Sequence, residues 1–408
     1  MTHKILLITS GQPSLNPRLV KEADALTNAG YDVTVLYAYW NDWGTKFDEE
    51  HLPDKKWKAI RVGGDPLQKP VKFLFSRILH KAAKSFYKKT GIPFLAEPAA
   101  SRSTYFLMQE AKKYKADLYI GHNLGALPAA VVAAKKHQAK CGFDAEDFHR
   151  QEVSDDVNSL HYKLTKYIED KYLSQTDYIT TSSVLINAKY QQLYPNKDIT
   201  TILNVFPKSP HVNLKSIPPK GPIKLIWFSQ TVGKKRGIEN IIKALQLLDN
   251  ERFELHLLGS AGEEIKNEFA NLAQNASKSL FFHPPIAPDK LIEFISQFDI
   301  GLACETGFSL NNTLALSNKI FTYLQAGLAI LSSDIPSQKQ LLEQNPGIGS
   351  VYENNNIDSL IGILAEYEAN RQKIIDNCDA AFKLGQEKYN WENESQTFLN
   401  LVNKTLNN

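Results

Sequence analysis

Short apolar runs alternate with amphipathic helical patterns along this 408-residue chain. Ile5–Thr9 is typical of a buried strand, Pro17–Ala29 of a helix that ends at Gly30, and Asp32–Tyr37 of the next strand. Strands that alternate with helices pair in parallel, because each helix carries the chain back across the sheet. The pattern therefore predicts the α/β fold class, with parallel sheets covered by helices.

The alternation is interrupted at residues 206–222, where five prolines occur without a helical period. Such a stretch is typical of a linker, and the chain is too long for one ordinary core. We therefore predict two Rossmann-like domains, residues 1–205 and 223–389, with a helix at residues 390–408 that packs back on the first. The further strands expected are Leu118–Gly121, Gly142–Ala145, Tyr178–Ser182, Ile223–Phe228, Glu254–Leu258, Ser279–Phe282, Ile300–Ala303 and Ala329–Ser333.

Composition excludes several classes of protein. The three cysteines, Cys141, Cys304 and Cys378, are too few and too scattered for a disulfide framework or a structural zinc site, and they suit a reducing cytosol. The net charge of +3 gives no case for nucleic-acid binding. No signal-peptide pattern and no run of about 20 apolar residues is present. We expect a cytoplasmic protein with no membrane span and no nucleic-acid partner.

The first loop of the second half has the composition of an anion site. The strand Ile223–Phe228 continues into a polar segment with three consecutive cations that ends in Arg236 and Gly237, before the helix Ile238–Leu248. Ligands of parallel sheets bind beyond the carboxyl ends of the strands, and a helix N-terminus attracts phosphate. Arg236 could bind a diphosphate with a bidentate fork. The alternative interpretation is a solvated basic turn.

A second polar loop, Cys304–Lys319, follows the strand Ile300–Ala303. It contains a carboxylate at Glu305, the amide of Asn312 and the hydroxyl of Ser317, which are groups that bind sugar hydroxyls and phosphate. Two plainer interpretations stay open. Ser317 could be only the N-cap of the next helix, and Asn312 only a turn former.

The first half carries a dense acid–base cluster. Glu146, Asp147 and His149 follow the strand that reaches Phe143, close to Asp144. Side chains of this kind, placed after a strand, are candidates for catalysis. The alternative is a helix start, where acidic residues favour the positive end of the helix dipole.

Two further loops of the first half should reach the ligand. His122 and Asn123 follow the strand Leu118–Gly121, and Asn16 lies in the loop that contains Gly11. We expect Asn16, His122 and Asn123 to face the ligand. Gly11 would permit close approach of the backbone to it.

Together these loops make the sequence resemble the GT-B-fold glycosyltransferases of the family 4 type over nearly the whole chain. The resemblance implies two Rossmann-like domains that face each other across a cleft, with the nucleotide-sugar donor bound by the second. It also implies that Gly11 lies near a donor phosphate and that the acceptor side of the first domain includes Asn16, His122 and Asn123. Arg236 and Gly237 match the pair that holds the donor diphosphate. Ser229 and Gln230 stand where many relatives have Gly-Arg, so a second phosphate-binding arginine is replaced.

The second polar loop matches the family in part. Glu305 resembles the first Glu of the acidic pair, and the position of the second Glu is held by Thr322. Asn318 and Lys319 match the branch of the family whose helix starts with Ser/Pro-Asn-Lys. The resemblance implies that these residues, with Asn312 and Ser317, bind the donor. It also implies base contacts from the backbone near Pro285 and Ile286.

The resemblance implies the reaction as well. Glu146 stands where relatives have a His near the reacting sugar, so its role is open: a base, a stabiliser of positive charge, or a partner of a sugar hydroxyl. The function implied is transfer of a sugar from a nucleotide-diphosphate sugar to a glycan, lipid-linked or protein-linked hydroxyl. Retention of configuration is expected, with no cofactor and no essential metal. A nucleotide-sugar 2-epimerase and a non-catalytic glycan-binding homologue are the alternatives.

The segment Lys69–Lys89 is amphipathic. At 100° per residue its large apolar residues, including Leu74 and Ile78, fall on one face, beside a basic edge that includes Arg77 and Lys84. Such a helix could lie on an anionic membrane, which places the protein on the inner face of the cytoplasmic membrane. Equally, the apolar face could pack on its own domain.

Overall fold

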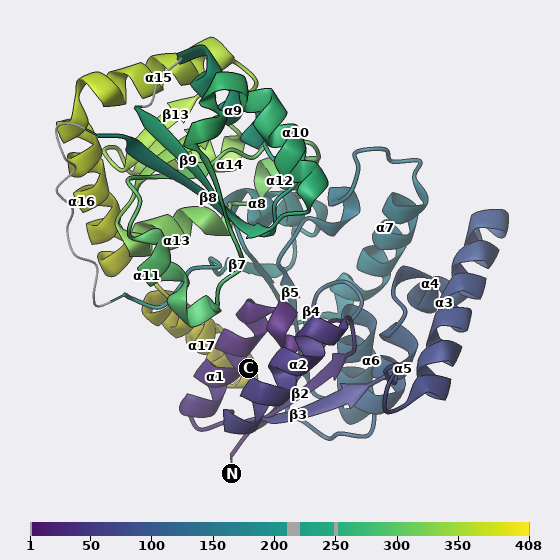
Figure 1. Ribbon diagram of the computed structural model, residues 1–408. Coiled ribbons are helices and arrows are strands. Elements are labelled where there is room, and N and C mark those ends of the chain that lie inside the picture. Colours follow the sequence, from purple (N-terminus) through teal and green to yellow (C-terminus); the bar gives the residue numbers. More distant parts are fainter. Residues whose placement is uncertain (1, 210–220, 249–251, 408) are drawn as a thin grey trace. The chain divides into compact units, whose positions relative to one another are not determined.

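The computed structural model describes residues 2–209, 221–248 and 252–407 (Figure 1). The chain forms two compact units. The first contains Met1–Leu203, Ser309–Asn311 and Ser395–Asn408, and the second contains Asn204–Phe308 and Asn312–Glu394. Most of the linker predicted at residues 206–222 lies outside the described residues.

The first unit is built on a parallel sheet of seven strands in the order β3-β2-β1-β4-β5-β6-β7. The central strand β1 pairs with β2 on one side, where Ile5 lies opposite Val33, and with β4 on the other, where Ile5 lies opposite Leu118. The strands are β1 (Lys4–Thr9), β2 (Asp32–Ala38), β3 (Lys58–Val62), β4 (Leu118–His122), β5 (Lys140–Ala145), β6 (Tyr178–Thr181) and β7 (Asp198–Thr201).

Helices connect these strands as the alternation predicts. The first begins at Pro17, where the side chain of Asn16 accepts a hydrogen bond from the backbone N–H of Leu19. The α-helices between the strands are α1 (Pro17–Asn28), α2 (Asp42–His51), α3 (Pro70–Thr90), α4 (Ala96–Ala100), α5 (Thr104–Ala111), α6 (Leu127–His137), α7 (Leu160–Tyr172) and α8 (Val184–Leu193).

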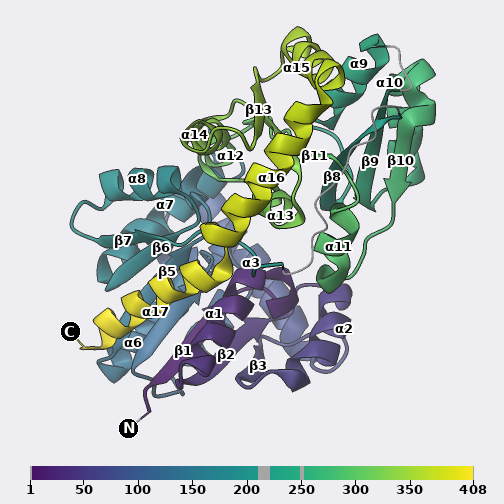
Figure 2. The same cartoon turned by 90° about the vertical axis from the view of Figure 1, so that its left-hand side faces the viewer.

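The last helix, α17 (Trp391–Asn407), ends on the first unit. Figure 2 shows it beside α1. The hydroxyl of Tyr31 donates to Asn403, and the Lys404 Nζ lies 2.7 Å from a carboxylate oxygen of Asp198. The chain therefore returns to its first unit after completing the second.

The second unit is built on a parallel sheet of six strands in the order β10-β9-β8-β11-β12-β13. Its core is apolar, with Leu225 and Trp227 of β8 packed against Leu255 and Leu257 of β9 and against Leu302 of β11. The strands are β8 (Ile223–Thr231), β9 (Phe253–Ser260), β10 (Leu280–His283), β11 (Ile300–Ala303), β12 (Ala329–Ser333) and β13 (Gly349–Tyr352).

The helices of the second unit follow the same alternation. Its α-helices are α9 (Ile238–Leu248), α10 (Glu263–Ala273), α11 (Leu291–Ile295), α12 (Leu310–Leu314), α13 (Asn318–Ala326), α14 (Pro336–Gln344), α15 (Ile357–Ala369) and α16 (Arg371–Glu387). The first two residues of α12 belong to the first unit. Within the described ranges, no helix of either unit combines the length and the apolar character needed to cross a membrane.

Both sheets have a topological switch point, where the strand order reverses. It lies between β1 and β4 in the first unit and between β8 and β11 in the second. In open α/β sheets such a point is where ligands bind, outside the carboxyl ends of the strands. The loops that follow β8 and β11 are the two polar loops singled out in the sequence.

Candidate functional site

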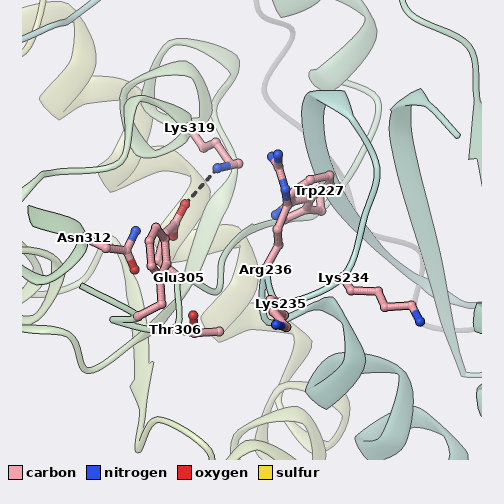
Figure 3. A pocket seen from close by; sticks show the side chains of 9 residues that line it. Trp227, Lys234, Lys235, Arg236, Glu305, Thr306, Asn312 and Lys319 are labelled. Carbon is pink, nitrogen blue, oxygen red and sulfur yellow. Dashed lines mark hydrogen bonds and ion pairs between the residues drawn. The ribbon is translucent and has the colours of Figure 1, made fainter. Parts of the chain in front are cut away.

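A pocket of about 600 Å³ lies at the switch point of the second sheet (Figure 3). Four of its lining residues carry a positive charge and one carries a negative charge, so the pocket suits an anion. Its walls come from the end of β8, from the loop after β8 and from the loop after β11. The lining residues are Trp227, Lys234, Lys235, Arg236, Glu305, Thr306, Phe308, Asn312 and Lys319.

Arg236 lies near the end of the loop after β8, and a hydrogen bond holds its side chain. Its Nη1 donates a hydrogen bond of 2.9 Å to the hydroxyl of Ser229 at the end of β8. Gly237 follows with a φ of +81°, and a Cβ there would lie 1.8 Å from the carbonyl oxygen of Cys304. Only glycine fits this position, because the loop after β8 packs directly on the start of the loop after β11. This close approach brings the two polar loops together.

Lys319 reaches the pocket from the first turn of α13. Its Nζ lies 2.7 Å from the Oε1 of Glu305, and Figure 3 shows this ion pair beside Arg236. The Glu305 carboxylate also accepts hydrogen bonds from Ser317 at 2.7 Å and from Gln338 at 2.6 Å. Although burial opposes ionisation, these partners, Lys319 first, hold the pKa of Glu305 below its usual value. Glu305 therefore orients Lys319 as a carboxylate.

Trp227 supports both cations of the pocket. The guanidinium carbon of Arg236 lies 5.9 Å from the Trp227 ring centroid, and the Lys319 Nζ lies 5.4 Å from it. Both distances are in the range of cation–π attraction. Lys234 points away from this group in Figure 3 and pairs with Glu268 at 2.6 Å. Our sequence interpretation missed Trp227, because it reads there as an apolar residue of a buried strand.

The structure shows how far the plainer interpretations, an N-cap for Ser317 and a turn former for Asn312, hold. Ser317 does occupy the N-cap position of α13, but its side chain makes no capping hydrogen bond and donates to Glu305 instead. Asn312 lines the pocket, and its Oδ1 also accepts a 2.7 Å hydrogen bond from the backbone N–H of Gly307. Asn312 thus shapes the turn and faces the pocket.

Several predicted donor residues lie outside the pocket lining, among them Thr322, Asn318 and Gln230. Thr322 has no exposed surface, and its hydroxyl donates back to the carbonyl of Asn318 one turn earlier. Asn318 is exposed at the start of α13. Gln230 is exposed near the end of β8. Thr322 is therefore enclosed within α13, and the contact that the resemblance implies for this position stays a prediction.

Pro285 and Ile286 follow β10, an edge strand separated from β8 by β9. They lie at the same edge of the sheet as the pocket but do not line it. Their expected contact with the nucleotide base stays a prediction.

The acid–base cluster of the first unit follows β5. Glu146 and Asp147 are partly exposed, and His149 is buried in the short helical turn His149–Gln151. A helix start, the plainer interpretation, is therefore present after the acidic residues, as a single turn of three residues. Burial, together with the charges of Asp147 and Asp144, raises the pKa of Glu146 to about 7. Such a carboxyl group exchanges a proton near neutral pH.

His149 is held as a cation. Its Nδ1 lies 2.9 Å from the Oε2 of Glu152. Burial opposes the charge, but the hydrogen bond and charge of Glu152 raise the pKa of His149 to about 9. Among the described residues, its buried Nε2 has no hydrogen-bond partner. His149 therefore favours the charged form at neutral pH.

His122 belongs to a buried charge cluster rather than to an open surface. It has no exposed area and lies 3.3 Å from Glu22 through Nε2 and 3.3 Å from Asp144 through Nδ1. Arg18 joins the cluster through a 2.8 Å hydrogen bond to Asp144. Burial opposes protonation, but the two carboxylates raise the pKa of His122 to about 9. Two cations and two anions thus balance in the interior.

The carboxylates and the imidazole of this cluster are close enough to hold a metal ion. Within the described part of the chain, Glu22, His122 and Asp144 are the group with such spacing. Arg18 fits poorly with a metal there, since its Nε lies 2.8 Å from Asp144 and 3.5 Å from Glu22. A guanidinium already supplies the positive charge that a metal would bring.

The remaining predicted residues of the first unit order the loop after β1. The Asn123 Oδ1 accepts from the Ser10 hydroxyl at 2.6 Å, and its Nδ2 donates to Thr9 at 3.0 Å. Asn16 caps α1 and is buried. A Cβ at Gly11 would meet no atom within 4 Å, so the space beside this backbone is open. Asn16 and Asn123 thus have structural partners, and Gly11 borders open space.

Comparison with known proteins agrees with this architecture. No protein-family model matches the sequence. A probable sucrose-phosphate synthase of Thermosipho melanesiensis is 23% identical over 379 residues, which cover 90% of this chain and 83% of that protein. Anabaena HepE in complex with UDP and glucose superimposes with a TM-score of 0.66 at 13% identity, covering 98% of this chain and all of that one.

A Staphylococcus aureus TarM mutant in complex with fondaparinux, alpha-GlcNAc-glycerol and UDP gives a TM-score of 0.68. Its identity is also 13%, and the match covers 98% of this chain and all of that one. At this identity the likeness establishes the fold. The predicted fold, two Rossmann-like α/β domains of the GT-B glycosyltransferase type, is therefore confirmed.

Proposed function

We propose that this protein is a glycosyltransferase that moves a sugar from a nucleotide-diphosphate sugar to an acceptor hydroxyl. The observation that carries the proposal is the pocket at the switch point between β8 and β11, where Arg236 and Lys319 flank the Trp227 ring. Similar folds in HepE and TarM are seen with UDP. UDP is therefore the first nucleotide to test.

In this proposal the two cations hold the diphosphate and offset its negative charge. Arg236 and Lys319 bind phosphate oxygens, and Gly237 lets the backbone approach them. Stabilising the leaving diphosphate lowers the barrier to breaking the bond between it and the anomeric carbon. Because the pocket supplies this charge from side chains, the proposal includes no essential metal and no cofactor.

The first unit supplies the acceptor side of the proposal. In the proposal Glu146, with its pKa near 7, accepts the proton of the acceptor hydroxyl or stabilises positive charge on the sugar. Asp147 and His149 set the electrostatic surroundings. The acceptor is a glycan, lipid-linked or protein-linked hydroxyl, and the resemblance favours transfer with retention of configuration.

We also propose a cytoplasmic location, peripheral to the membrane. All three cysteines are buried thiols, as suits a reducing compartment. The association with the membrane would come through residues 69–89.

The first experiment is a thermal-shift screen of UDP, GDP, ADP and CMP and their sugars. A ligand at 100 times its dissociation constant adds about 2.7 kcal/mol of stability. A nucleoside diphosphate that stabilises the wild type but not Arg236→Ala is the expected result. NMR of the donor with acceptor glycans then follows product. Donor epimerised at C-2 would instead identify an epimerase, and binding without turnover would identify a glycan-binding homologue.

A further inference from the structure

Large apolar side chains are concentrated on the surface of α3 and the segments on either side of it. Leu74 is 58% exposed and Ile78 is 57% exposed, although both belong to a regular helix. The exposed large apolar residues between positions 67 and 94 are Leu67, Val71, Leu74, Phe75, Ile78, Phe86, Ile92 and Phe94. A contiguous surface of this kind marks an interaction site.

The exposed face is not the face through which α3 packs. Ser76, Ala83 and Tyr87 are the buried residues of the helix, and the His80 Nδ1 lies 2.7 Å from the Pro98 carbonyl of α4. At 100° per residue, Ile78 is about 160° around the axis from the centre of the packed face. The interpretation in which the apolar face packs on its own domain is therefore wrong for this side of the helix.

The helix is anchored, so the exposed face has a fixed orientation. It begins at Pro70, and Gly91 ends it with a φ of +69°. On the packed side the ring of Phe73 lies 5.5 Å from that of Tyr39 and 4.8 Å from the guanidinium of Arg102. An apolar face presented by an anchored helix is a surface rather than a loosely packed segment. Figure 1 shows α3 on the outside of the first unit.

The charges around this face all have one sign. Seven Lys and Arg residues and no acidic residue occur between Asp65 and Glu97. All seven are exposed, and within the described residues none of them forms an ion pair. Arg77, Lys81 and Lys84, with Lys88, line one edge of the apolar face.

The exposed apolar face and the positive charges beside it together indicate what binds there. A second copy of the same face would place seven positive charges against seven, which repels. A bilayer with anionic headgroups offers an apolar interior to the side chains of the apolar face and negative charge to the basic edge. We infer that α3 is a membrane-docking helix that lies flat in the headgroup region of an anionic phospholipid bilayer, with Val71, Leu74 and Ile78 toward the acyl chains.

This inference goes beyond the proposed transfer reaction and names the partner of a surface far from the donor pocket in sequence. It bears on the acceptor only through the proposed function, since an enzyme docked in this way is suited to a lipid-linked hydroxyl. The docking itself can be measured without donor or acceptor, so its failure and the failure of the transfer proposal are separate results.

The test is flotation of the full chain with two kinds of vesicle, phosphatidylcholine alone and phosphatidylcholine mixed with phosphatidylglycerol. We expect the wild type to float with the mixed vesicles at low salt, to float at least about tenfold less with phosphatidylcholine alone, and to be released by salt. A wild type that remains at the bottom of the gradient with the mixed vesicles at low salt would overturn the inference.

Two variants separate insertion from simple charge attraction. Leu74→Ser with Ile78→Ser removes apolar surface that is already exposed, so the fold is retained, and binding should fall about tenfold or more. The matched control is Leu247→Ser on α9 of the second unit, which is 63% exposed and should bind like the wild type. Unchanged flotation of the Leu74→Ser, Ile78→Ser variant would contradict insertion.

The charge variant replaces Arg77, Lys81, Lys84 and Lys88 with Gln and should also lose about tenfold or more of the binding. Its control carries the same change in net charge at exposed lysines of the second unit: Lys243, Lys278, Lys339 and Lys383. Equal loss in both would show that net charge alone attracts the protein. A dimer in sedimentation equilibrium that Leu74→Ser with Ile78→Ser dissociates would instead assign the face to a second copy.

Discussion

The two units place charged side chains at the switch points of their sheets in opposite ways. In the second unit, Arg236 and Lys319 border an open pocket and exceed the negative charge of Glu305. In the first, Arg18 and His122 are sealed in the interior with Glu22 and Asp144.

The difference shows what a charged residue after a strand can do. A charged side chain that stays in water costs the folded state little free energy. An excess of such charge of one sign can then attract a ligand of the opposite sign. A charge that is removed from water must be balanced by its neighbours, and it then holds elements together. The buried cluster joins α1 to the ends of β4 and β5. It therefore fixes the backbone from which the loop with Glu146 begins.

The largest expected effect tests the buried cluster. Arg18→Met leaves the buried carboxylates of Glu22 and Asp144 with His122 as their one remaining cation, so the free energy of unfolding should fall by about 3–5 kcal/mol. Urea unfolding measures it. Arg236→Met at the pocket is the matched control and should change stability by about 0.5 kcal/mol or less. Similar losses in the two variants would break the comparison.

The next effect concerns the chemistry above that cluster. Glu146→Gln should lower kcat about 10²-fold, the size of a positioned acid–base effect, and leave nucleotide affinity unchanged. In the wild type, kcat/KM should rise with pH through about 7 as Glu146 loses its proton, since its raised pKa lies there. The pH profile of the variant should not show this rise. A wild-type profile in Glu146→Gln would assign the chemistry elsewhere, with Asp147→Asn the next variant to measure.

The pocket is tested by affinity. Arg236→Ala should weaken the binding of UDP by about 1.5–3 kcal/mol, the range for a hydrogen bond to a charged group, and isothermal calorimetry measures it. Lys234→Ala is the control, because that cation is paired with Glu268. Equal losses in both would reduce the site to a diffuse positive surface, without the specific contact that we propose.

The smallest effect is on stability against pH. The pKa of His149 is raised to about 9, so its contribution is complete below 6.5, the usual pKa, and is lost as pH rises through about 9. We expect the unfolding free energy to fall by about 1 kcal/mol over this window, because solvent screens the partly exposed Glu152. Glu152→Gln should flatten that slope. His122, whose pKa is also about 9, would keep part of it.

The central strands could be predicted from the sequence, and three edge strands could not. Ile300–Ala303 and Ala329–Ser333 have the predicted bounds, because buried parallel strands are continuous apolar runs. The three strands that were not predicted are β3, β7 and β13. Each is an outer strand of its sheet with partly exposed residues, so it lacks an apolar run of that kind.

Residues of the candidate site could be predicted from the sequence only where their position directly after a strand brings them to the ligand edge of the sheet. That rule brought Arg236 and Glu305 to one pocket. The same rule placed His122 at the ligand, but this residue ends β4 and is buried in the interior. Thr322, expected at the site from the resemblance, is buried in α13 as well. Trp227 and Gln338 were missed because their importance lies in what they contact. A spacing of four between Arg18 and Glu22 was the available sign of the buried cluster.

The three cysteines offer a consequence for experiment. Cys141 lies in the first unit, and Cys304 and Cys378 lie in the second. Burial raises the pKa of the Cys141 and Cys304 thiols, so the folded protein should resist alkylating reagents. Each thiol becomes reactive when its own unit opens. Pulsed alkylation with mass analysis of the peptides would therefore time the opening of each half of the molecule without any introduced label.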